Sequence, residues 1–449
     1  EITVRSPYLV GWLILSEKDG KSALSFIKMR TVKRDDIDAE GNPVERDSII
    51  FYDVEKYFRP DLGTEPKGLM EHIGVEYDFG FSDAVYDEIV VMQGKDNWVE
   101  LNGNTMEHEV YTKEEFGNDL PENFEPVEAA MTFSSKLIRD KNGFIYLHRK
   151  VLANDYHAGS YISVPLANST KFKGLYQAHK LYNRNYYVIP ACTEDNSLVG
   201  IWDAGRYNEY SLDGTPSAIT ENSSRNDGNI VELTENTDEK HFKQMSKNVI
   251  AMIPATCGRD NRFDVTDSYI VPKWLALMEE KGTYSMRYFG LEGDTSGGIV
   301  TVTDFKEVPV DARVFAAGYV DMAVFQHKKY VVFASGKEIW YCPYGGSTSN
   351  AVLLKKFDQN IVSISSHDVE EYTRDGDIYH NGHLGVALEN GDFFIYEVVE
   401  EDKVLDNITV NQLYPSPETE DKDNNNFGKI VDTLYKFGNA SGVFTYTFQ

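Results

Sequence analysis

Short hairpins with a glycine in the turn recur along this chain at similar intervals, and this repeat constrains the fold more than any other feature. In the first hairpin, Leu13–Leu15 and Ala23–Ile27 flank a turn at Asp19-Gly20. Tight turns of this kind need a positive φ, which glycine adopts without steric cost. The spacing between turn glycines is 49 residues from Gly94 to Gly143, 55 from Gly336 to Gly391 and 51 from Gly391 to Gly442.

A period of about 40 to 50 residues is typical of the four-stranded blades of a β-propeller. We therefore predict an all-β fold, a β-propeller with seven blades, and keep six and eight as alternatives. In this count the first hairpin (Leu13–Ile27) and the last (Leu434–Phe448) share a blade, so pairing of the N- and C-terminal strands closes the ring. A pair of β-sandwiches also has many short strands, but the similar hairpins continue to the last residue, which favours a ring.

The organisation predicted from this pattern is one propeller-like domain over residues 1–449. No segment is convincing as an interdomain linker. Polar stretches without hydrophobic periodicity predict long surface loops near residues 31–48, 205–240 and 415–428.

One short helix is predicted from Pro272 to Lys281. Proline suits the first position of a helix, and Gly282 suits its end. Trp274, Leu275 and Met278 belong to the apolar side, which we interpret as packing on a sheet edge.

Charge excludes some partners. The 449 residues include 44 basic and 72 acidic side chains, which give a formal net charge of −28 at pH 7. Such a surface repels phosphate backbones and anionic lipid heads, so the sequence argues against nucleic-acid and membrane-surface binding. The motifs G-x-S-x-G, H-E-x-x-H and G-x-G-x-x-G are absent, which removes the common hydrolase, metalloprotease and dinucleotide signatures.

The three cysteines, Cys192, Cys257 and Cys342, lie far apart and show no C-x-x-C spacing. They indicate neither a structural zinc site nor a disulfide framework. We interpret each as a small buried apolar side chain. A disulfide between Cys192 and Cys257 stays open as an alternative.

Aromatic rings beside polar side chains are candidates for ligand binding, because rings stack on the apolar faces of sugars while amides and guanidinium groups bind hydroxyls. The candidate ligand-binding residues are Tyr182, Asn183, Arg184, Tyr186 and Tyr344. The alternative for the first four is a strand edge with exposed polar residues. For Trp98, Trp202 and Trp340, which occupy equivalent positions in second strands, packing between blades is favoured.

One stretch is similar to a calcium loop. Asp421, Asp423 and Asn425 place side-chain oxygens at alternate positions, and Asp432 is the twelfth residue counted from Asp421. Asn426 stands where such a loop has its turn glycine, and Asp432 is shorter than the usual bidentate Glu. A solvated loop is the alternative, and calcium is the only cofactor retained.

The stretch Ser6–Ile27, which contains Gly11-Trp12 and Asp19-Gly20-Lys21-Ser22, resembles the PKD-like family of Bacteroidota surface lipoproteins. Arg139–Tyr146, Phe172-Lys173 and the Tyr-rich Leu181–Ile189 are similar in style. The resemblance implies a secreted lipoprotein with a signal peptide, a lipid-carrying cysteine and immunoglobulin-like repeats ahead of a β-rich portion. It implies an outer-membrane, cell-surface location through a lipid anchor that these 449 residues do not include, and it transfers no catalytic residues.

Three functions follow as hypotheses. The first is a non-enzymatic cell-surface protein that captures a glycan or peptide for an outer-membrane nutrient-uptake system, with transporter components as further partners. The second is a propeller enzyme that acts on polysaccharide through a carboxylate pair, although 72 acidic residues will satisfy that spacing somewhere by chance. The third is a structural, protein-docking subunit of a surface complex. No catalytic residue is identified.

Overall fold

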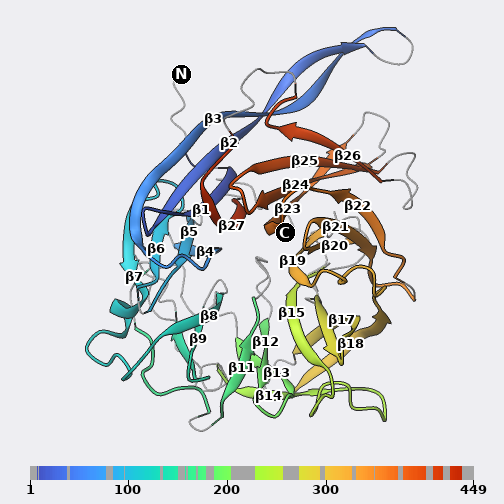
Figure 1. Ribbon diagram of the computed structural model, residues 1–449. Coiled ribbons are helices and arrows are strands. Elements are labelled where there is room, and N and C mark those ends of the chain that lie inside the picture. The colour runs from blue at the N-terminus through green and yellow to red at the C-terminus, as the bar shows by residue number, and fades with distance from the viewer. Residues whose placement is uncertain are drawn as a thin grey trace.

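A computed structural model of the chain is shown in Figure 1. It describes residues 8, 10–37, 41–76, 84–95, 97–131, 135–149, 157, 160–167, 170–177, 187–203, 228–255, 273–293, 299–325, 330–347, 349–372, 378–400, 408–417 and 425–436.

Seven antiparallel units, which we call blades 1 to 7, follow one another around a ring (Figure 1). Blade 1 contains β27 (Lys429–Lys436), β1 (Gly11–Lys18), β2 (Lys21–Ile37) and β3 (Pro43–Thr64); blade 2 contains β4 (Gly68–Glu76), β5 (Ala84–Met92), β6 (Val99–Asn102) and β7 (His108–Tyr111). Blade 3 contains β8 (Pro126–Met131), β9 (Ser135–Asp140) and β10 (Ile145–Arg149), and it is preceded by the 3-10 helix η1 (Thr112–Phe116). Blade 4 contains β11 (Phe172–Leu175), β12 (Tyr187–Thr193), β13 (Leu198–Asp203) and β14 (Ile230–Thr234).

The remaining three blades have four strands each. Blade 5 contains β15 (Asn248–Pro254), β16 (Lys273–Glu280), β17 (Thr283–Gly293) and β18 (Val300–Pro309). Blade 6 contains β19 (Tyr319–Phe325), β20 (Tyr330–Ser335), β21 (Glu338–Pro343) and β22 (Val352–Lys356); blade 7 contains β23 (Ile361–Tyr372), β24 (Ile378–Leu388), β25 (Phe393–Glu400) and β26 (Ile408–Tyr414). Blades 4 and 5 are joined at their outer edges, where β14 and β18 pair in parallel.

The ring is closed by strands from the two ends of the described chain. β27 pairs antiparallel with β1, from Gly11 opposite Lys436 to Glu17 opposite Lys429. Closure removes two exposed sheet edges, which would otherwise be templates for aggregation. The predicted seven-bladed propeller, closed by its terminal strands, is therefore confirmed; the second strand of the last predicted hairpin lies outside the described residues.

The core consists of seven apolar clusters, one between each pair of neighbouring blades. Successive side chains of a strand point to opposite faces, so a strand inside the ring supplies two clusters. In β1, Trp12 and Ile14 pack against blade 7, whereas Leu13 and Leu15 pack against blade 2. Burial of each such side chain stabilises the fold by about 1.5–3 kcal/mol.

The helix predicted from Pro272 to Lys281 is wrong, because residues 273–280 form strand β16. Its apolar run is buried on both faces: Trp274, Ala276 and Met278 face blade 4, and Leu275 and Leu277 face blade 6. A strand with two buried faces lacks alternation, so its pattern cannot be distinguished from that of a buried helix.

The surface loop predicted near residues 31–48 is largely replaced by strand. β2 and β3 pair from Lys21 opposite Thr64 to Ile37 opposite Pro43, and their ends project beyond the ring (Figure 1). This stretch is rich in charged residues and lacks the apolar alternation of a half-buried strand, which is why its sequence predicts a loop. Residues 204–227 and 418–424, in the other two predicted loops, lie outside the described residues, and β14 occupies 230–234.

Two other predictions concern buried side chains. Cys192 and Cys342 are buried free thiols, as interpreted, so Cys192 takes part in no disulfide; Cys257 lies outside the described residues. Trp98, Trp202 and Trp340 are all buried in clusters between blades, which confirms their packing role.

Candidate functional site

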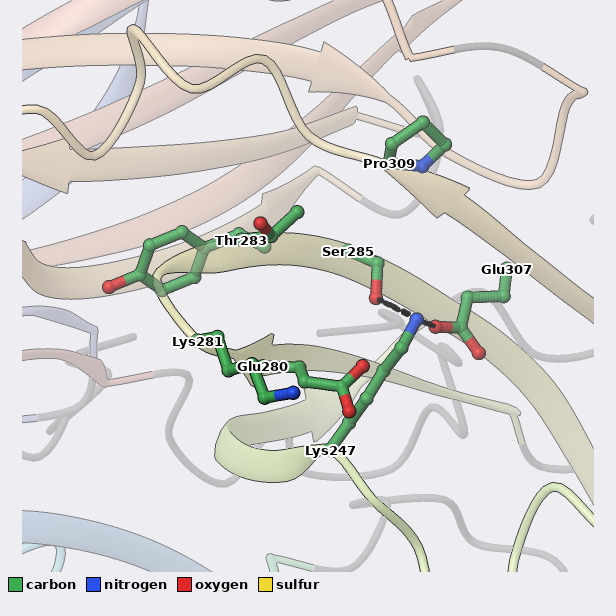
Figure 2. A pocket seen from close by; sticks show the side chains of 8 residues that line it. Lys247, Glu280, Lys281, Thr283, Ser285, Glu307 and Pro309 are labelled. Carbon is green, nitrogen blue, oxygen red and sulfur yellow. Dashed lines mark hydrogen bonds and ion pairs between the residues drawn. The ribbon is translucent and has the colours of Figure 1, made fainter.

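A cavity of about 580 Å³ opens beside the β16–β17 hairpin of blade 5 (Figure 2). Its lining comes from three places: the residue before β15, the hairpin itself, and the end of β18. The lining residues are Lys247, Glu280, Lys281, Thr283, Tyr284, Ser285, Glu307 and Pro309. Its volume is within the range of about 300–1,000 Å³ that is usual for small-molecule sites.

Glu307 is the fixed charged group of this pocket. Its carboxylate accepts hydrogen bonds from Ser285 Oγ (2.7 Å) and from Arg287 Nη2 (2.8 Å) and pairs with Lys247 Nζ, as Figure 2 shows for Ser285 and Lys247. Burial opposes ionisation of this carboxyl, but the Arg287 charge and the hydrogen bonds outweigh it and lower the pKa of Glu307 to about 2. Glu307 is therefore ionised at every physiological pH.

The rim of the pocket combines hydroxyl, ammonium, carboxylate and aromatic groups. Thr283 and Lys281 lie on the exposed side of the hairpin turn, and Lys281 has a φ of 51°. The Tyr284 ring packs against Phe315 at 4.5 Å between ring centroids, so its position is set by the core. Tyr284 faces blade 6 and Ser285 faces blade 4, so the ring and the polar group line the pocket from opposite faces of β17. Hydrogen-bond donors and acceptors at fixed positions suit a polar organic ligand.

A second unusual site is a layer of charged side chains buried between blades 2 and 3. On blade 2, His72 lies directly opposite Glu88, and Glu100 lies opposite Val90, two residues from Glu88 on the same face. Cross-strand neighbours of this kind approach within reach of each other. Lys136 of β9 faces them from blade 3 and is fully buried. We call His72, Glu88, Glu100, Glu115, Lys136 and His157 the charged layer.

Lys136 is at the centre of the charged layer. Its ammonium donates hydrogen bonds to Glu100 Oε2 (2.8 Å) and to Glu115 Oε1 (2.7 Å). Glu115 belongs to η1, whose neighbouring Phe116 inserts into the apolar cluster between blades 2 and 3 and so turns Glu115 inward. His157 lies on the other side, with Nε2 at 3.0 Å from Glu88 Oε1 and Nδ1 at 3.3 Å from Glu115 Oε1.

Burial and charge act in opposite directions on these groups. Burial raises the pKa of Glu88 to about 8, although His157 lowers it in part. Burial disfavours the charged forms of both Lys136 and Glu100, but for each group the attraction of its partners' opposite charges outweighs burial. The pKa of Lys136 therefore rises, and that of Glu100 falls well below its usual range. Burial disfavours imidazolium too, but hydrogen bonds to Glu115 and Glu88 raise the pKa of His157 to about 10.

The residues predicted as ligand contacts are placed as follows. Tyr344 is buried in the cluster between blades 5 and 6, where its ring lies 5.5 Å from that of Tyr288, so most of its surface is used in packing. Tyr182, Asn183, Arg184 and Tyr186 lie outside the described residues, and so their role stays a prediction.

Of the four predicted calcium ligands, two lie outside the described residues and two lie within them. Asp421 and Asp423 lie outside the described residues, whereas Asn425 is buried with its carbonyl bonded to the N–H of Phe393. Asp432 lies on β27, where its oxygens accept hydrogen bonds from Leu69 N (2.7 Å) and from Ser363 Oγ (2.9 Å). Asp432 therefore links blade 1 to blades 2 and 7.

The sequence reasoning missed the charged layer, but the sequence contains a signal for it. Three of its members lie two residues from an apolar core residue: His72 after Met70, Glu100 after Trp98, and Lys136 before Ile138. In a strand this spacing places both residues on the same face. A charged residue on a face whose next position is apolar indicates burial of that charge.

Comparison with known proteins gives likenesses of fold only. No family model matches the sequence, and no curated protein does. The WD40 repeats of RRP9 are 7% identical over 84% of this chain and 85% of that one, with a TM-score of 0.44. The dihydro-heme d1 dehydrogenase NirN is 10% identical (98% and 78% covered, TM-score 0.36), and the WD40 domain of SCAP from fission yeast is 10% identical (77% and 72%, TM-score 0.34). With TM-scores below 0.5, we take nothing about function from these proteins.

Membrane insertion by a helix has no support in the described residues. No helix among them has the length and apolar character that a bilayer span requires.

Proposed function

We propose that this protein is a non-catalytic binding protein whose blade 5 pocket takes a glycan. The observation that carries the proposal is the pocket of about 580 Å³, in which hydrogen bonds and an ion pair join Glu307, Ser285 and Lys247, and which Tyr284 lines from the other face of β17. Sugar hydroxyls need donors and acceptors at fixed positions, and an aromatic ring suits the apolar face of a sugar. A pocket that is organised before binding loses less conformational entropy when the ligand enters.

Glu307 cannot act as the general acid of a glycoside hydrolase at this pocket. Hydrolysis by a carboxylate pair needs one carboxyl that stays protonated near neutral pH to act as the general acid. The pKa of Glu307 is lowered to about 2 because Arg287 and its hydrogen bonds outweigh burial, so this carboxyl cannot donate a proton there. Glu307 serves instead as a permanent acceptor.

The cellular setting of the proposal comes from the sequence. The resemblance of Ser6–Ile27 to PKD-like surface lipoproteins supports a place at the cell surface, beside the components of an outer-membrane uptake system. The net charge of −28 would keep such a domain soluble and away from anionic lipid. Surface labelling of intact cells that carry the protein tests the location.

The binding proposal is tested by a thermal-shift screen of the purified chain against glycans and peptides, each with and without calcium. A ligand that binds only the folded state raises Tm as its concentration rises. Each hit is then repeated with Glu280→Gln and with Lys281→Asn, which keeps a residue that tolerates positive φ in the turn. The matched control is Lys356→Asn on the outer strand of blade 6, where the side chain is 65% exposed.

The expected result is a dose-dependent shift with one glycan class that both pocket variants weaken and the control does not. Hydrolysis of that glycan would replace the proposal with the polysaccharide-enzyme hypothesis. A response only to peptides, or a glycan response that the pocket variants leave unchanged, would contradict the proposed site. A response to none of them would favour the protein-docking hypothesis.

A further inference from the structure

The three side chains of blade 2 in the charged layer have the composition of a metal site. His72, Glu88 and Glu100 offer one imidazole nitrogen and two carboxylates, and one ligand atom from each lies within 4.8 Å of the others. The Nε2 atom of His72 is 3.2 Å from Glu100 Oε2 and 3.5 Å from Glu88 Oε2. Ligand atoms about 2.0–2.1 Å from a tetrahedral zinc ion are about 3.3 Å apart, so the two separations from His72 Nε2 are close to those of zinc ligands. Glu100 Oε2 also accepts the hydrogen bond from Lys136, and Oε1 is the oxygen of Glu100 without a donor.

Two carboxylate oxygens in this group accept no hydrogen bond from any described residue. They are Glu88 Oε2 and Glu100 Oε1, and their side chains are at least 98% buried. A buried carboxylate oxygen without a donor is costly, and each such atom in a folded protein calls for an explanation. A cation between the two carboxylates satisfies both.

The charges in the layer fit a divalent ion. Glu88, Glu100 and Glu115 carry three negative charges when ionised, and Lys136 supplies one positive charge through its bonds to Glu100 and Glu115. The carboxylates of the layer thus outnumber its one lysine, and a cation between Glu88 and Glu100 adds positive charge at the two carboxylate oxygens that Lys136 does not bond.

We propose that His72, Glu88 and Glu100 bind a divalent transition-metal ion, for which zinc is the reference. Imidazole with carboxylates suits zinc and its neighbours among the first-row metals better than calcium or magnesium, which take oxygen ligands. The neighbouring group of Glu100, Glu115 and His157 is the weaker site, because Lys136 lies between two of its carboxylates.

This site is structural in character. Its three ligands are at least 98% buried, which leaves no room for a substrate. His157, with 16% of its side chain exposed, is the most accessible described member of the charged layer. The ion would fix one face of blade 2 next to blade 3, and the site is separate from the blade 5 pocket.

The test starts with the unmodified chain. The purified protein is stripped with a chelator, dialysed against zinc, and its bound metal is counted by mass spectrometry. We expect one zinc ion per chain and a Tm that increases with the logarithm of zinc concentration. Cobalt is the second probe, because its visible absorption reports the coordination number in the folded wild-type protein.

Variants then locate the ion. His72→Gln and Glu88→Gln each remove one ligand while keeping side-chain size or polarity, and we expect zinc affinity to fall at least about 100-fold. Glu115→Gln changes the neighbouring group without touching the three ligands, and Glu338→Gln changes a partly exposed carboxylate in blade 6. Both controls should keep one zinc ion per chain. Circular dichroism of the metal-free variants establishes that they fold.

Three outcomes overturn the proposal. The first is that wild-type protein holds no zinc after dialysis at micromolar metal and gives no cobalt spectrum. The second is zinc binding that survives in folded His72→Gln and Glu88→Gln variants, which would place the ion elsewhere. The third is loss of zinc in Glu115→Gln alone, which would assign the ion to the neighbouring group.

Discussion

Replacing Lys136 with methionine should destabilise the folded chain by about 3–5 kcal/mol, the usual cost when one member of a buried ion pair is removed. Methionine keeps an unbranched stem of similar volume, so the loss arises mainly from charge. Lys136 is fully buried and donates to Glu100 and Glu115 at 2.8 and 2.7 Å. Each charge-assisted hydrogen bond contributes about 1.5–3 kcal/mol, and release of the buried ammonium offsets part of the sum.

The assay is urea unfolding followed by tryptophan fluorescence in the presence of a chelator. Trp98 is fully buried in the cluster between blades 2 and 3 and is therefore a reporter beside the substitution. The control is Lys356→Met, which removes a surface pair with Glu338 whose lysine is 65% exposed. A pair of that kind contributes less than about 1 kcal/mol.

The pH dependence of the Lys136→Met variant gives a second readout. Burial raises the pKa of Glu100, and Lys136 is the largest of the groups that hold it well below its usual range, so removal of the Lys136 charge moves this pKa upward. In the variant, ionisation of Glu100 then destabilises the folded state at every pH above the pKa of Glu100 in the unfolded chain. The difference in free energy of unfolding between variant and wild type should therefore grow between pH 5 and pH 8. A loss of stability below about 1 kcal/mol at pH 8, or one independent of pH, would refute the electrostatic reasoning.

Three more predictions concern the ring. Gly385→Ala should lower the urea midpoint strongly, because its Cβ would lie 2.4 Å from the Trp12 ring between blades 7 and 1; an unchanged midpoint would mean that this interface is looser than described. Asp432→Ala should lower the free energy of unfolding by about 2–3 kcal/mol, since it leaves the Leu69 N–H and the Ser363 hydroxyl without their acceptor. A decrease in Tm no larger than that for an exposed Asp→Ala substitution would contradict this. Burial lowers the pKa of His383 to about 4, so as pH falls from about 6.5 to 4 the unfolded chain binds this proton before the folded chain does, and the free energy of unfolding falls by about 3 kcal/mol. The His383→Phe variant should lose that part of the pH dependence. Equal pH dependence in the two proteins would disprove the prediction.

The architecture could be predicted because residues typical of tight turns recur at a regular interval in the sequence. Asp19 and Gly20 both have positive φ, 52° and 75°, as the Asp-Gly turn requires, and Gly143 and Gly391 have φ of 88° and 93° in equivalent turns. Gly94 is an exception, since the positive φ of its turn lies at Lys95 (58°). Blade number and closure then follow from the count.

The same reasoning failed where burial is two-sided or absent. Residues 274–278 are all apolar because both faces of β16 are covered there, and the β2–β3 extension is rich in charged residues without an alternating pattern. Strand alternation exists only when one face is buried. The sequence did not predict the pocket for another reason: Lys247 before β15, Ser285 of β17 and Glu307 of β18 are far apart in the chain and meet only in the folded blade 5.

The charged layer is the feature of this propeller that the fold itself does not require. The His and acidic side chains of the described residues form two groups with metal-binding spacing, and both lie between blades 2 and 3. An apolar interface of the same volume would be as stable or more stable, since buried ion pairs lose as much in desolvation as they gain in attraction. Because the ring closes through β27 and β1, each interface supports the two beside it, and stabilisation of one should be felt around the ring. An ion at His72, Glu88 and Glu100 would therefore raise the stability of the whole fold, so zinc should protect amide hydrogens of blades 1 and 4 as well as those of blades 2 and 3 from exchange.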